Sequence, residues 1–485
     1  MADPDISKLL ANASVVESNE LNFAGRELKL DSEDDAREIV DAIHKCQKLI
    51  SLKLDGNTLG VTAAKAIAKA LESHPEFKRA LWKDLFTGRL KTEIPDALNF
   101  LSGGLILANA KLTELDLSDN AFGPIGVKGI QILIESPTCF QLQKLRLNNN
   151  GLGITGGKIL ADALIKCHER CITTSLPFCL RVFMCGRNRL ENEGAQALSQ
   201  FFAVAGTLEE IYMPQNGIYH EGIAALAISF VKNPNLQVIN LNDNTATETG
   251  GIIIANAIAY LHKLRILNLG DCLLRCAGAM MLAAAIKDLN ELEELHVGFN
   301  EIPTEAAIMI LMGLNGKAKL SKVDLDGNLF ATEGCIKVKS MFQQILPGVL
   351  GSLSEDEGLD DDDKDEDEAE DSGNLEATSR LEDSCNDIED EVDEIEIPIH
   401  STVIKTNSNI PEPFDVPSMK ITTKEFLDSP TADKFLALGN DRLCRIMEEI
   451  NNDLDFDRRI ATLPNKAMEA CGNAKHKLMQ SLYRF

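Results

Sequence analysis

A leucine-rich motif that recurs along most of the chain is the sequence feature that most restricts its fold. The pattern LxxLxLxxNxL begins at Leu49 as LISLKLDGNTL and returns eight more times, ending with LSKVDLDGNLF from Leu320. In the later copies the asparagine position falls at residues 188, 216, 244, 272, 300 and 328, a step of 28 each time. A period of this length, held over five steps, indicates a repeat architecture.

Each unit is expected to form a short strand followed by a helix. Apolar residues alternate in the strand, as at Leu115 and Leu117, which places them on one face. In the stretch that follows they recur at helical spacing, as at Leu160 and Leu164. Because one strand and helix cannot bury their own apolar faces, the units must stack. The sequence therefore predicts an α/β leucine-rich-repeat solenoid of about eleven units, a horseshoe like ribonuclease inhibitor, with parallel strands concave and helices convex.

The first half of the array is less regular than the second. Its asparagine positions, at residues 57, 85, 120, 150 and 188, are separated by 28, 35, 30 and 38 residues. Insertions are therefore expected near residues 88–110 and 165–179. The repeated asparagine is expected to point inward and to bond the backbone of the turn, because a buried amide donates and accepts at once.

The distribution of charge divides the chain into three predicted regions. Lysine and arginine number 48 against 75 acidic residues, a net charge of −27 that argues against a nucleic-acid-binding surface. Residues 355–396 alone hold 23 acidic residues and two basic ones. Such a segment cannot build a core. We therefore predict a repeat domain over residues 1–350, a disordered acidic linker over 351–412 and a short, truncated helical region over 413–485.

Motifs for catalysis, cofactors and membrane insertion are missing from the sequence. No GxSxG, HExxH or HxH occurs. GLGITG at residues 151–156 matches a dinucleotide fingerprint, but sister units carry glycines in the same turn, so we assign it to the repeat. The cysteines from 167 to 185 lack zinc-site spacing and are interpreted as reduced thiols. We predict no metal, no cofactor, no secretion and no membrane insertion.

Two segments are candidates for contact with a partner. Residues 81–95 contain the single tryptophan, Trp82, and the tripeptide 87–89, which is expected to be exposed. In the triple asparagine at 148–150, Asn150 takes the inward ladder position, so Asn148 and Asn149 are expected to point outward. Polar residues also occupy the concave strand positions. Such a face is typical of a docking surface, although Asp324 and Asp326 leave catalysis open as an alternative.

Several of these segments together resemble a known family. FTGRLKTEIP, LSDNAFGP, NNNGLG, CGRNRLEN, MPQNGI, LNDNTATETG and GDCLLR are similar to the Ran GTPase-activating proteins over about residues 20–345. The resemblance implies stimulation of GTP hydrolysis on the GTP form of the small GTPase Ran, at the active site of the GTPase, which keeps cytosolic Ran in its GDP form. It further implies a Ran-binding protein in a ternary complex, and a cytoplasmic location that includes the cytoplasmic side of the nuclear pore.

Two activation mechanisms follow from that resemblance. Arg89 is a candidate arginine finger, whose guanidinium would neutralise developing phosphate charge. Alternatively, an uncharged amide orders the catalytic glutamine of the GTPase, which is how the family is understood to work, and the matching asparagine is Asn149. We favour Asn149, with Arg89 in a supporting role. The expected docking residues lie at strand ends or in adjoining loops: Lys91, Asp119, Arg187, Arg189, Asn216, Asp243 and Asp271.

Two other functions remain open at this stage. The first is a leucine-rich scaffold or inhibitor that binds a protein without altering its chemistry, and the second is an autonomous hydrolase.

The C-terminal segments DSPTADKFLALG and NAKHKLMQSLYRF resemble the two ends of the domain that carries conjugated SUMO in animal members of the family. The strict pattern for a SUMO acceptor lysine, which is an apolar residue, Lys, any residue and Glu, occurs at residues 90–93 as LKTE and not after residue 400.

Overall fold

The structure, a computed structural model, describes residues 19–356, which form a single curved stack of repeat units. The chain divides into two compact units, Met1–Gly358 and Leu359–Phe485. The second unit lies outside the described residues. So do nearly all of the predicted acidic linker and the whole of the predicted helical region at 413–485.

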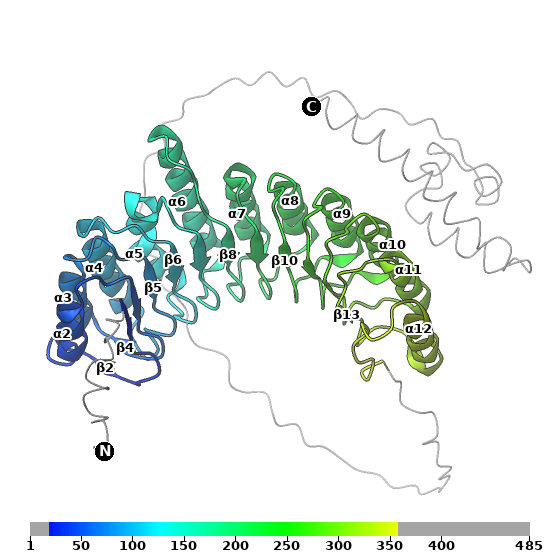
Figure 1. The fold of residues 1–485 in the computed structure, drawn as a ribbon, viewed down its shortest axis with the longest axis horizontal. Coiled ribbons are helices and arrows are strands. Elements are labelled where there is room, and N and C mark those ends of the chain that lie inside the picture. Colours follow the sequence, from blue (N-terminus) through cyan, green and yellow to red (C-terminus); the bar gives the residue numbers. More distant parts are fainter. Residues whose placement is uncertain (1–18, 357–485) are drawn as a thin grey trace, which may run out of the picture. The chain divides into compact units, whose positions relative to one another are not determined.

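An 11-stranded parallel sheet lines the inner side of the arc, with one short strand from each unit (Figure 1). Neighbouring strands in the sheet are neighbours in the sequence, which is the stacking that the repeat predicts. The strands are β1 (Glu20–Asn22), β3 (Ser51–Lys53), β5 (Arg79–Leu81), β6 (Glu114–Asp116), β7 (Lys144–Arg146), β8 (Val182–Met184), β9 (Glu210–Tyr212), β10 (Val238–Asn240), β11 (Ile266–Asn268), β12 (Glu294–His296) and β13 (Lys322–Asp324). A separate two-stranded sheet pairs β2 (Lys29–Leu30) with β4 (Thr58–Leu59).

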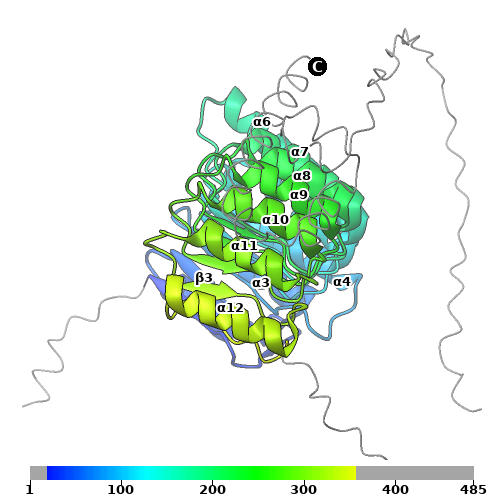
Figure 2. The same cartoon turned by 90° about the vertical axis from the view of Figure 1, so that its right-hand side faces the viewer.

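A row of helices forms the outer side of the arc, as expected for this solenoid. Figure 2 shows α12 at the C-terminal end of the row with α11, α10 and α9 stacked behind it. The helices are α2 (Arg37–Lys45), α3 (Val61–Leu71), α4 (Glu93–Leu107), α5 (Gly123–Glu135), α6 (Gly153–Thr173), α7 (Glu191–Ala205), α8 (His220–Phe230), α9 (Thr247–Ile258), α10 (Arg275–Ile286), α11 (Thr304–Leu314) and α12 (Ala331–Ile345). A 3-10 turn at Pro137–Cys139 follows α5. The predicted α/β leucine-rich-repeat fold is confirmed.

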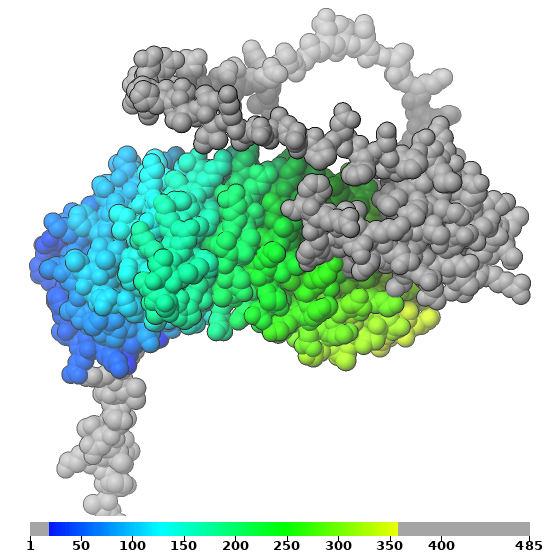
Figure 3. All heavy atoms as spheres, turned by 90° about the horizontal axis from the view of Figure 1, so that it is seen from above, coloured from blue at the N-terminus to red at the C-terminus, as the bar shows by residue number. Residues whose placement is uncertain are grey.

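The core lies between the sheet and the helices and runs the length of the stack. The central residue of each strand points into it, and these residues pair in register, as Leu115, Leu145, Phe183 and Ile211 do. All four are fully buried. Burial of each such side chain stabilises the fold by about 1.5–3 kcal/mol. Figure 3 shows the colours following one another from blue to yellow along the stack, so the units lie in sequence order.

The irregular repeat spacings lengthen one helix and one loop and leave the strands unchanged. Strands β6, β7 and β8 are three residues long, like those of the regular units. In contrast, α6 has 21 residues, whereas the helices of the regular units have 11 to 15. The loop between β5 and α4 spans residues 82–92, whereas the loop between β9 and α8 spans 213–219. The extra residues therefore lie in one long helix on the outer side of the arc and in one long loop that follows a strand. Trp82, in the irregular segment at 81–95, is 1% exposed and belongs to the core.

A further strand-like segment and turn follow the eleventh unit. Val323 bridges Leu350 in parallel, and its N–H donates to the carbonyl of Val349 at 2.8 Å. Asp356 lies 28 residues after Asn328, which is one repeat step, and it is 4% exposed. The packed repeat domain therefore extends to residue 356 and does not end at 350 as predicted. The sequence pattern missed this partial unit because an aspartate takes the place of the asparagine.

Candidate functional site

The side chains at the strand ends are presented by a row of left-handed backbone residues. In each unit the residue before the ladder position has a positive φ, for example 59° at Asp119 and 54° at Asn149. Asparagine and aspartate tolerate this conformation better than most residues other than glycine, which explains their frequency here. We call these residues the edge row: Gly56, Asp84, Asp119, Asn149, Arg187, Gln215, Asp243, Asp271, Phe299 and Gly327.

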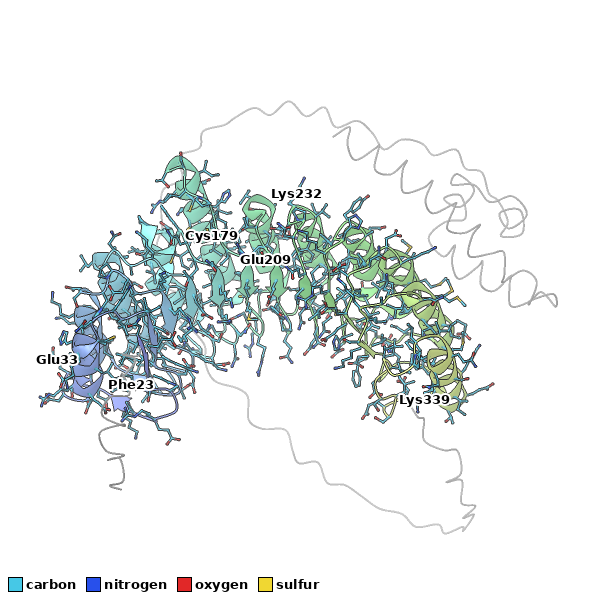
Figure 4. The ribbon with its side chains drawn as sticks, in the orientation of Figure 1. Phe23, Glu33, Cys179, Glu209, Lys232 and Lys339 are labelled. Atoms are coloured by element: carbon cyan, nitrogen blue, oxygen red, sulfur yellow. The ribbon has the colours of Figure 1, made fainter. Side chains whose placement is uncertain are left out.

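Backbone hydrogen bonds between units hold the edge row in place. The N–H of Asp119 donates to the carbonyl of Asn148 at 2.8 Å, and that of Asn149 donates to the carbonyl of Gly186 at 2.8 Å. The same bond recurs from Arg187 to Pro214. Each edge residue is thus fastened to the following unit, so its side chain leaves the sheet in a defined direction. Figure 4 shows side chains projecting along the inner side of the arc.

Directly behind the edge row, the ladder asparagines form a buried chain of hydrogen bonds. Asn150 is fully buried, and its Oδ1 accepts from the N–H of Asn120 at 2.9 Å. Its Nδ2 donates to the carbonyl of Leu117 at 3.0 Å, and its own N–H donates to Oδ1 of Asn188 at 3.0 Å. The amide therefore donates and accepts at once, as expected, and it fixes the turn that carries Asn149.

Asn149 presents its amide at the surface with one end already bonded. The side chain is half-buried, and its Nδ2 donates to Oδ1 of Asp119 at 2.9 Å. Within residues 19–356, Oδ1 of Asn149 accepts no hydrogen bond. Its neighbour Asn148 differs, because Oδ1 of Asn148 accepts from the N–H of Gly186 at 2.8 Å and so braces the strand end. Of the two asparagines expected to point outward, Asn149 has the available acceptor.

The carboxylate of Asp119 links Asn149 to a cation. Nζ of Lys83 lies 3.0 Å from Oδ2 of Asp119. Partial burial raises the pKa of Asp119, but hydrogen bonds from Asn149 and Lys83 and the charges of Lys83 and Arg187 outweigh it, so the pKa lies below its usual value. The same hydrogen bond raises the pKa of Lys83. Asp119 is therefore ionised and Lys83 is protonated at neutral pH.

Arg89 is bound into the scaffold. Its guanidinium donates from Nε to Oγ1 of Thr58 and from Nη2 to the carbonyl of Thr58, both at 2.9 Å. It also forms an ion pair with Asp31, and its side chain is 14% exposed. The expectation of exposure holds for Thr87 and Gly88 but not for Arg89. An arginine finger at this position would first have to give up three interactions.

The other expected docking residues differ in their accessibility. Lys91, Arg187, Arg189 and Asp271 are exposed, and Asp243 is half-buried. Asn216 corrects the expectation, because it is a ladder residue and only 1% exposed. Its Nδ2 donates to the carbonyl of Cys185 at 2.9 Å and its Oδ1 accepts from the N–H of Asn188 at 3.0 Å. No polar group of Asn216 is left for a partner within the described residues.

Sequence reasoning missed two residues of this surface. Gln215 is the edge residue of the unit that contains Asn216, and it is exposed. Counting one residue back from each ladder asparagine would have found it. Lys83 precedes the edge residue Asp84 and reaches across to Asp119 in the next unit. Its role depends on a contact between units 36 residues apart in sequence, which no local pattern reveals.

The concave face carries paired charges and no catalytic arrangement that we can recognise in residues 19–356. Glu114 bonds Arg79 at 2.9 Å and also pairs with Arg146 across three strands. Asp326 accepts from the N–H of Glu355 at 2.9 Å, and Asp324 accepts from the N–H of Asp326 at 3.3 Å. Asp326 therefore bonds backbone at the end of the stack, and the other oxygen of Asp324 lies 3.5 Å from Nδ1 of His296.

The cysteines near α6 are structural. Cys167 and Cys171 lie on α6 and are buried, and burial raises the pKa of the buried Cys185 to about 12. Thiols this hard to ionise are poor metal ligands and poor nucleophiles. Among residues 19–356, no cluster of histidine, cysteine and acidic residues could hold a metal ion. In the same residues, no helix has the length and apolar character needed to cross a membrane.

Comparison with known proteins agrees with the fold and with the resemblance. A leucine-rich-repeat family model matches residues 108–130, which contain β6 and the start of α5. Ran GTPase-activating protein 1 of Xenopus laevis is 56% identical over 221 residues, and the Ran GTPase-activating protein of Drosophila melanogaster is 50% identical over 199 residues. The chain is thus related to the Ran GTPase-activating proteins.

The relationship covers part of each protein. The matched segment is 45% of this chain and 38% of the Xenopus Ran GTPase-activating protein 1, and it is 41% of this chain and 33% of the Drosophila protein. Ran GTPase-activating protein 1 of Saccharomyces cerevisiae is 33% identical over 202 residues, which are 41% of this chain and 49% of the yeast protein. The chain therefore matches about a third to a half of the length of these relatives.

Proposed function

We propose that this chain activates GTP hydrolysis by a Ran-type small GTPase in its GTP form and thereby maintains the GDP form during nucleocytoplasmic transport. The hydrolysis takes place in the active site of the GTPase, so the chain is an activator and not itself the enzyme. Identity of 50–56% to Ran GTPase-activating proteins supports this proposal. The repeat array supports it as well, because a long curved inner side is suited to holding a folded protein.

The proposed mechanism adds one polar group to a site that already holds its nucleotide and Mg²⁺. Small GTPases are slow because the glutamine that orients the attacking water is poorly held, and activators supply up to ~10⁵-fold, or about 7 kcal/mol. An amide can hold a glutamine side chain by accepting from its NH₂ group and donating to its carbonyl oxygen. An activator that works in this way needs no nucleotide site of its own.

The proposed mechanism is supported by the difference in hydrogen bonding between the two candidate side chains. Asn149 has a half-buried amide whose Oδ1 accepts no hydrogen bond within residues 19–356. Arg89, in contrast, has its guanidinium bonded to Thr58 and Asp31. We therefore assign the ordering of the glutamine to Asn149. Arg89 supports the interface from within the scaffold by holding the loop at 87–90.

The part of the edge row from Asp119 to Asp271 and the loops beside it form the proposed docking surface. Its charged members flank Asn149 on both sides along the arc, so a GTPase bound there would place its nucleotide pocket near the amide. Exposed charges of this kind affect the rate of encounter more than the final affinity. The proposed contact residues are Lys91, Asp119, Arg187, Arg189, Gln215, Asp243 and Asp271.

The cellular setting follows from the same proposal. An activator that keeps Ran in the GDP form would act in the cytoplasm, including the cytoplasmic side of the nuclear pore, and would meet Ran in a ternary complex with a Ran-binding protein. Imaging of the tagged full-length chain tests the location. Gel filtration of the chain with Ran and a Ran-binding protein tests the ternary complex.

One assay tests the proposed function against its two alternatives. The purified chain is mixed with GTP alone, with Ran bound to GTP, and with a different small GTPase bound to GTP, and phosphate release is measured. We expect acceleration in the Ran mixture only. Release from GTP alone would indicate an autonomous hydrolase. Binding to Ran without acceleration would indicate a scaffold or inhibitor and would overturn the proposal.

A further inference from the structure

The amide of Asn149 has two orientations that differ in chemistry but hardly in shape. Rotation by half a turn about its last bond exchanges Oδ1 and Nδ2. Only one of the two orientations lets Nδ2 donate to Asp119, at the observed 2.9 Å. In the other orientation Oδ1 would face a carboxylate oxygen at that distance, and two acceptors would repel each other. An ionised Asp119 therefore selects one orientation of the Asn149 amide.

Asp119 is itself held firmly enough to make this selection. Its backbone has a φ of 59°, and its N–H donates to the carbonyl of Asn148 at 2.8 Å. Nζ of Lys83 lies 3.0 Å from Oδ2, the oxygen that Asn149 does not use. The two carboxylate oxygens thus have one partner each, from different units. Hydrogen bonds to charged groups are about twice as strong as those between neutral groups, so this arrangement is well ordered.

The selected orientation determines what the amide offers to a bound protein. One N–H of Nδ2 is used by Asp119, which leaves the second N–H and the whole of Oδ1. These two groups can pair with a glutamine side chain, with Oδ1 accepting from its Nε2 and Nδ2 donating to its Oε1. The reversed amide could not form this pair in the same register, because its acceptor and donor would be exchanged.

We propose that Asp119, held by Lys83, is a positioning residue that orients the Asn149 amide toward the glutamine of the GTPase. This inference rests on the proposed function. It changes the role of Asp119 from a docking contact to a support for Asn149. Within residues 19–356, Asn149 is the one edge-row amide that bonds a carboxylate, since the side chain of Gln215 makes no hydrogen bond there.

The test measures single-turnover GTP hydrolysis on Ran over a range of activator concentrations. A positioning role predicts that Asp119→Ala lowers the maximal rate about 10-fold, equivalent to 1.4 kcal/mol, with the half-saturating concentration unchanged. Lys83→Met should lower it about 3-fold, because the carboxylate remains but is less well held. A rise in the half-saturating concentration alone would identify Asp119 as a docking residue and overturn the inference.

Asp84→Ala is the matched control. Asp84 occupies the preceding position of the edge row with a φ of 48°, and its side chain accepts from Thr87 and not from Asn149. Both alanine variants therefore place alanine at a positive φ. We expect Asp84→Ala to keep the wild-type maximal rate, and an equal loss in both variants would attribute the effect to the backbone.

A double-mutant cycle separates this inference from the proposed function. If Asp119 acts through Asn149, adding Asp119→Ala to Asn149→Ala should cause no further loss of maximal rate. Additive losses would overturn the positioning role even if the chain activates Ran. If the wild-type chain fails to activate Ran, the proposed function fails first. In that case NMR spectra still test the contact between Asn149 and Asp119. The side-chain N–H signals of Asn149 should shift in Asp119→Ala and keep their wild-type positions in Asp84→Ala.

Discussion

The two halves of the edge row share one backbone geometry but differ in how their side chains are held. In the first half, Lys83, Asp119 and Asn149 are joined across three units by contacts of 2.9 and 3.0 Å. In the second half, Asp243 and Asp271 have φ values of 56° and 50°, yet within residues 19–356 their carboxylates accept no hydrogen bond. A fixed side chain is suited to ordering a partner's group, whereas an unbonded one is suited to adapting to a partner's surface.

The difference lies in the residues and not in the fold. Strands of three residues and the same unit-to-unit backbone bonds occur in both halves. The irregular spacing of the first half lengthens α6 on the outer side and the loop before α4, while the edge residues keep the same backbone conformation. A solenoid can therefore specialise one stretch of its edge by substitution alone, because the repeat keeps each edge residue in the same conformation.

The largest expected effect is on the activation of GTP hydrolysis by Asn149, in the first half of the edge row. Asn149→Ala should lower the maximal rate of activated GTP hydrolysis about a thousandfold or more, because it removes the group proposed to order the glutamine. Its stability should fall by about 1 kcal/mol, because alanine tolerates a φ of 54° less well than asparagine and because one hydrogen bond is lost. Single-turnover phosphate release and urea unfolding measure the two quantities.

Arg89→Ala tests the arginine-finger mechanism against the mechanism that assigns activation to Asn149. Because Arg89 bonds Thr58 and Asp31 within the scaffold, we expect a partial loss of rate together with a loss of stability of about 1 kcal/mol. Complete loss of activation in Arg89→Ala, with little loss in Asn149→Ala, would instead establish an arginine finger.

The second effect contrasts an edge amide with a ladder amide. Asn216→Ala should lower the free energy of unfolding by about 2–3 kcal/mol, because it leaves the carbonyl of Cys185 and the N–H of Asn188 without their buried partner. Activation per folded molecule should remain, since Asn216 has no exposed polar group. Urea unfolding of this variant beside Asn149→Ala tests the contrast, and equal stabilities would contradict it.

The third effect concerns the end of the stack. Burial raises the pKa of Asp356 to about 6, and the charge of Asp326 adds to the rise. A raised folded-state pKa means that the contribution to stability is complete below about pH 4 and is lost as the pH rises through about 6. Asp356→Asn cannot ionise. It should therefore be more stable than wild type by about 1–2 kcal/mol at pH 8 and little different at pH 4.

Urea unfolding at the two pH values checks this prediction. Asp326→Asn is the control for charge alone, because Asp326 bears a carboxylate at the same end of the stack but is half-buried. An equal gain at pH 4 and pH 8 for Asp356→Asn would show that titration of this carboxyl has no part in the stability of the C-terminal turn.

The smallest effect tests a break in the regular half. Cys272 stands at a ladder position, and its Sγ lies 3.3 Å from the carbonyls of Leu241 and Gly270. In the preceding unit, Oδ1 of Asn244 accepts a hydrogen bond from the N–H of Asn216. A thiol at residue 272 offers no such oxygen to the N–H of Asn244. Cys272→Asn should complete the ladder and stabilise the chain by about 1 kcal/mol. A loss of stability on urea unfolding would mean that the pocket is too small for the amide.

The repeat made most of the fold predictable, and the contacts between units did not follow from it. The 28-residue step and the leucine pattern gave the strands, the helices and the inward asparagines. The same step would have identified Asp356 as a ladder residue, but the acidic composition that starts at Glu355 concealed it. Asn216 was misassigned to the surface because ladder and edge positions are adjacent and both favour asparagine.

The sequence allowed Asn149 to be predicted as the main residue of the candidate site, but it did not reveal the contacts that hold the surrounding side chains. Asn149 followed from its place beside a ladder asparagine and from the family resemblance. The burial of Arg89 depends on Thr58 and Asp31, which lie 31 and 58 residues earlier in the chain. The link from Lys83 to Asp119 likewise joins two neighbouring units, 36 residues apart in the chain. Such contacts require the register of neighbouring units, which the irregular spacing of the first half hides from the sequence.

A crystal structure of this chain bound to Ran with a non-hydrolysable GTP analogue tests directly whether Asn149 orders the catalytic glutamine. We expect Oδ1 of Asn149 to lie about 2.7–3.2 Å from the NH₂ group of the catalytic glutamine of Ran, while Nδ2 keeps its contact with Asp119. A complex in which Asn149 faces away from the nucleotide pocket, or in which Arg89 leaves Thr58 and contacts the γ-phosphate, would contradict this mechanism.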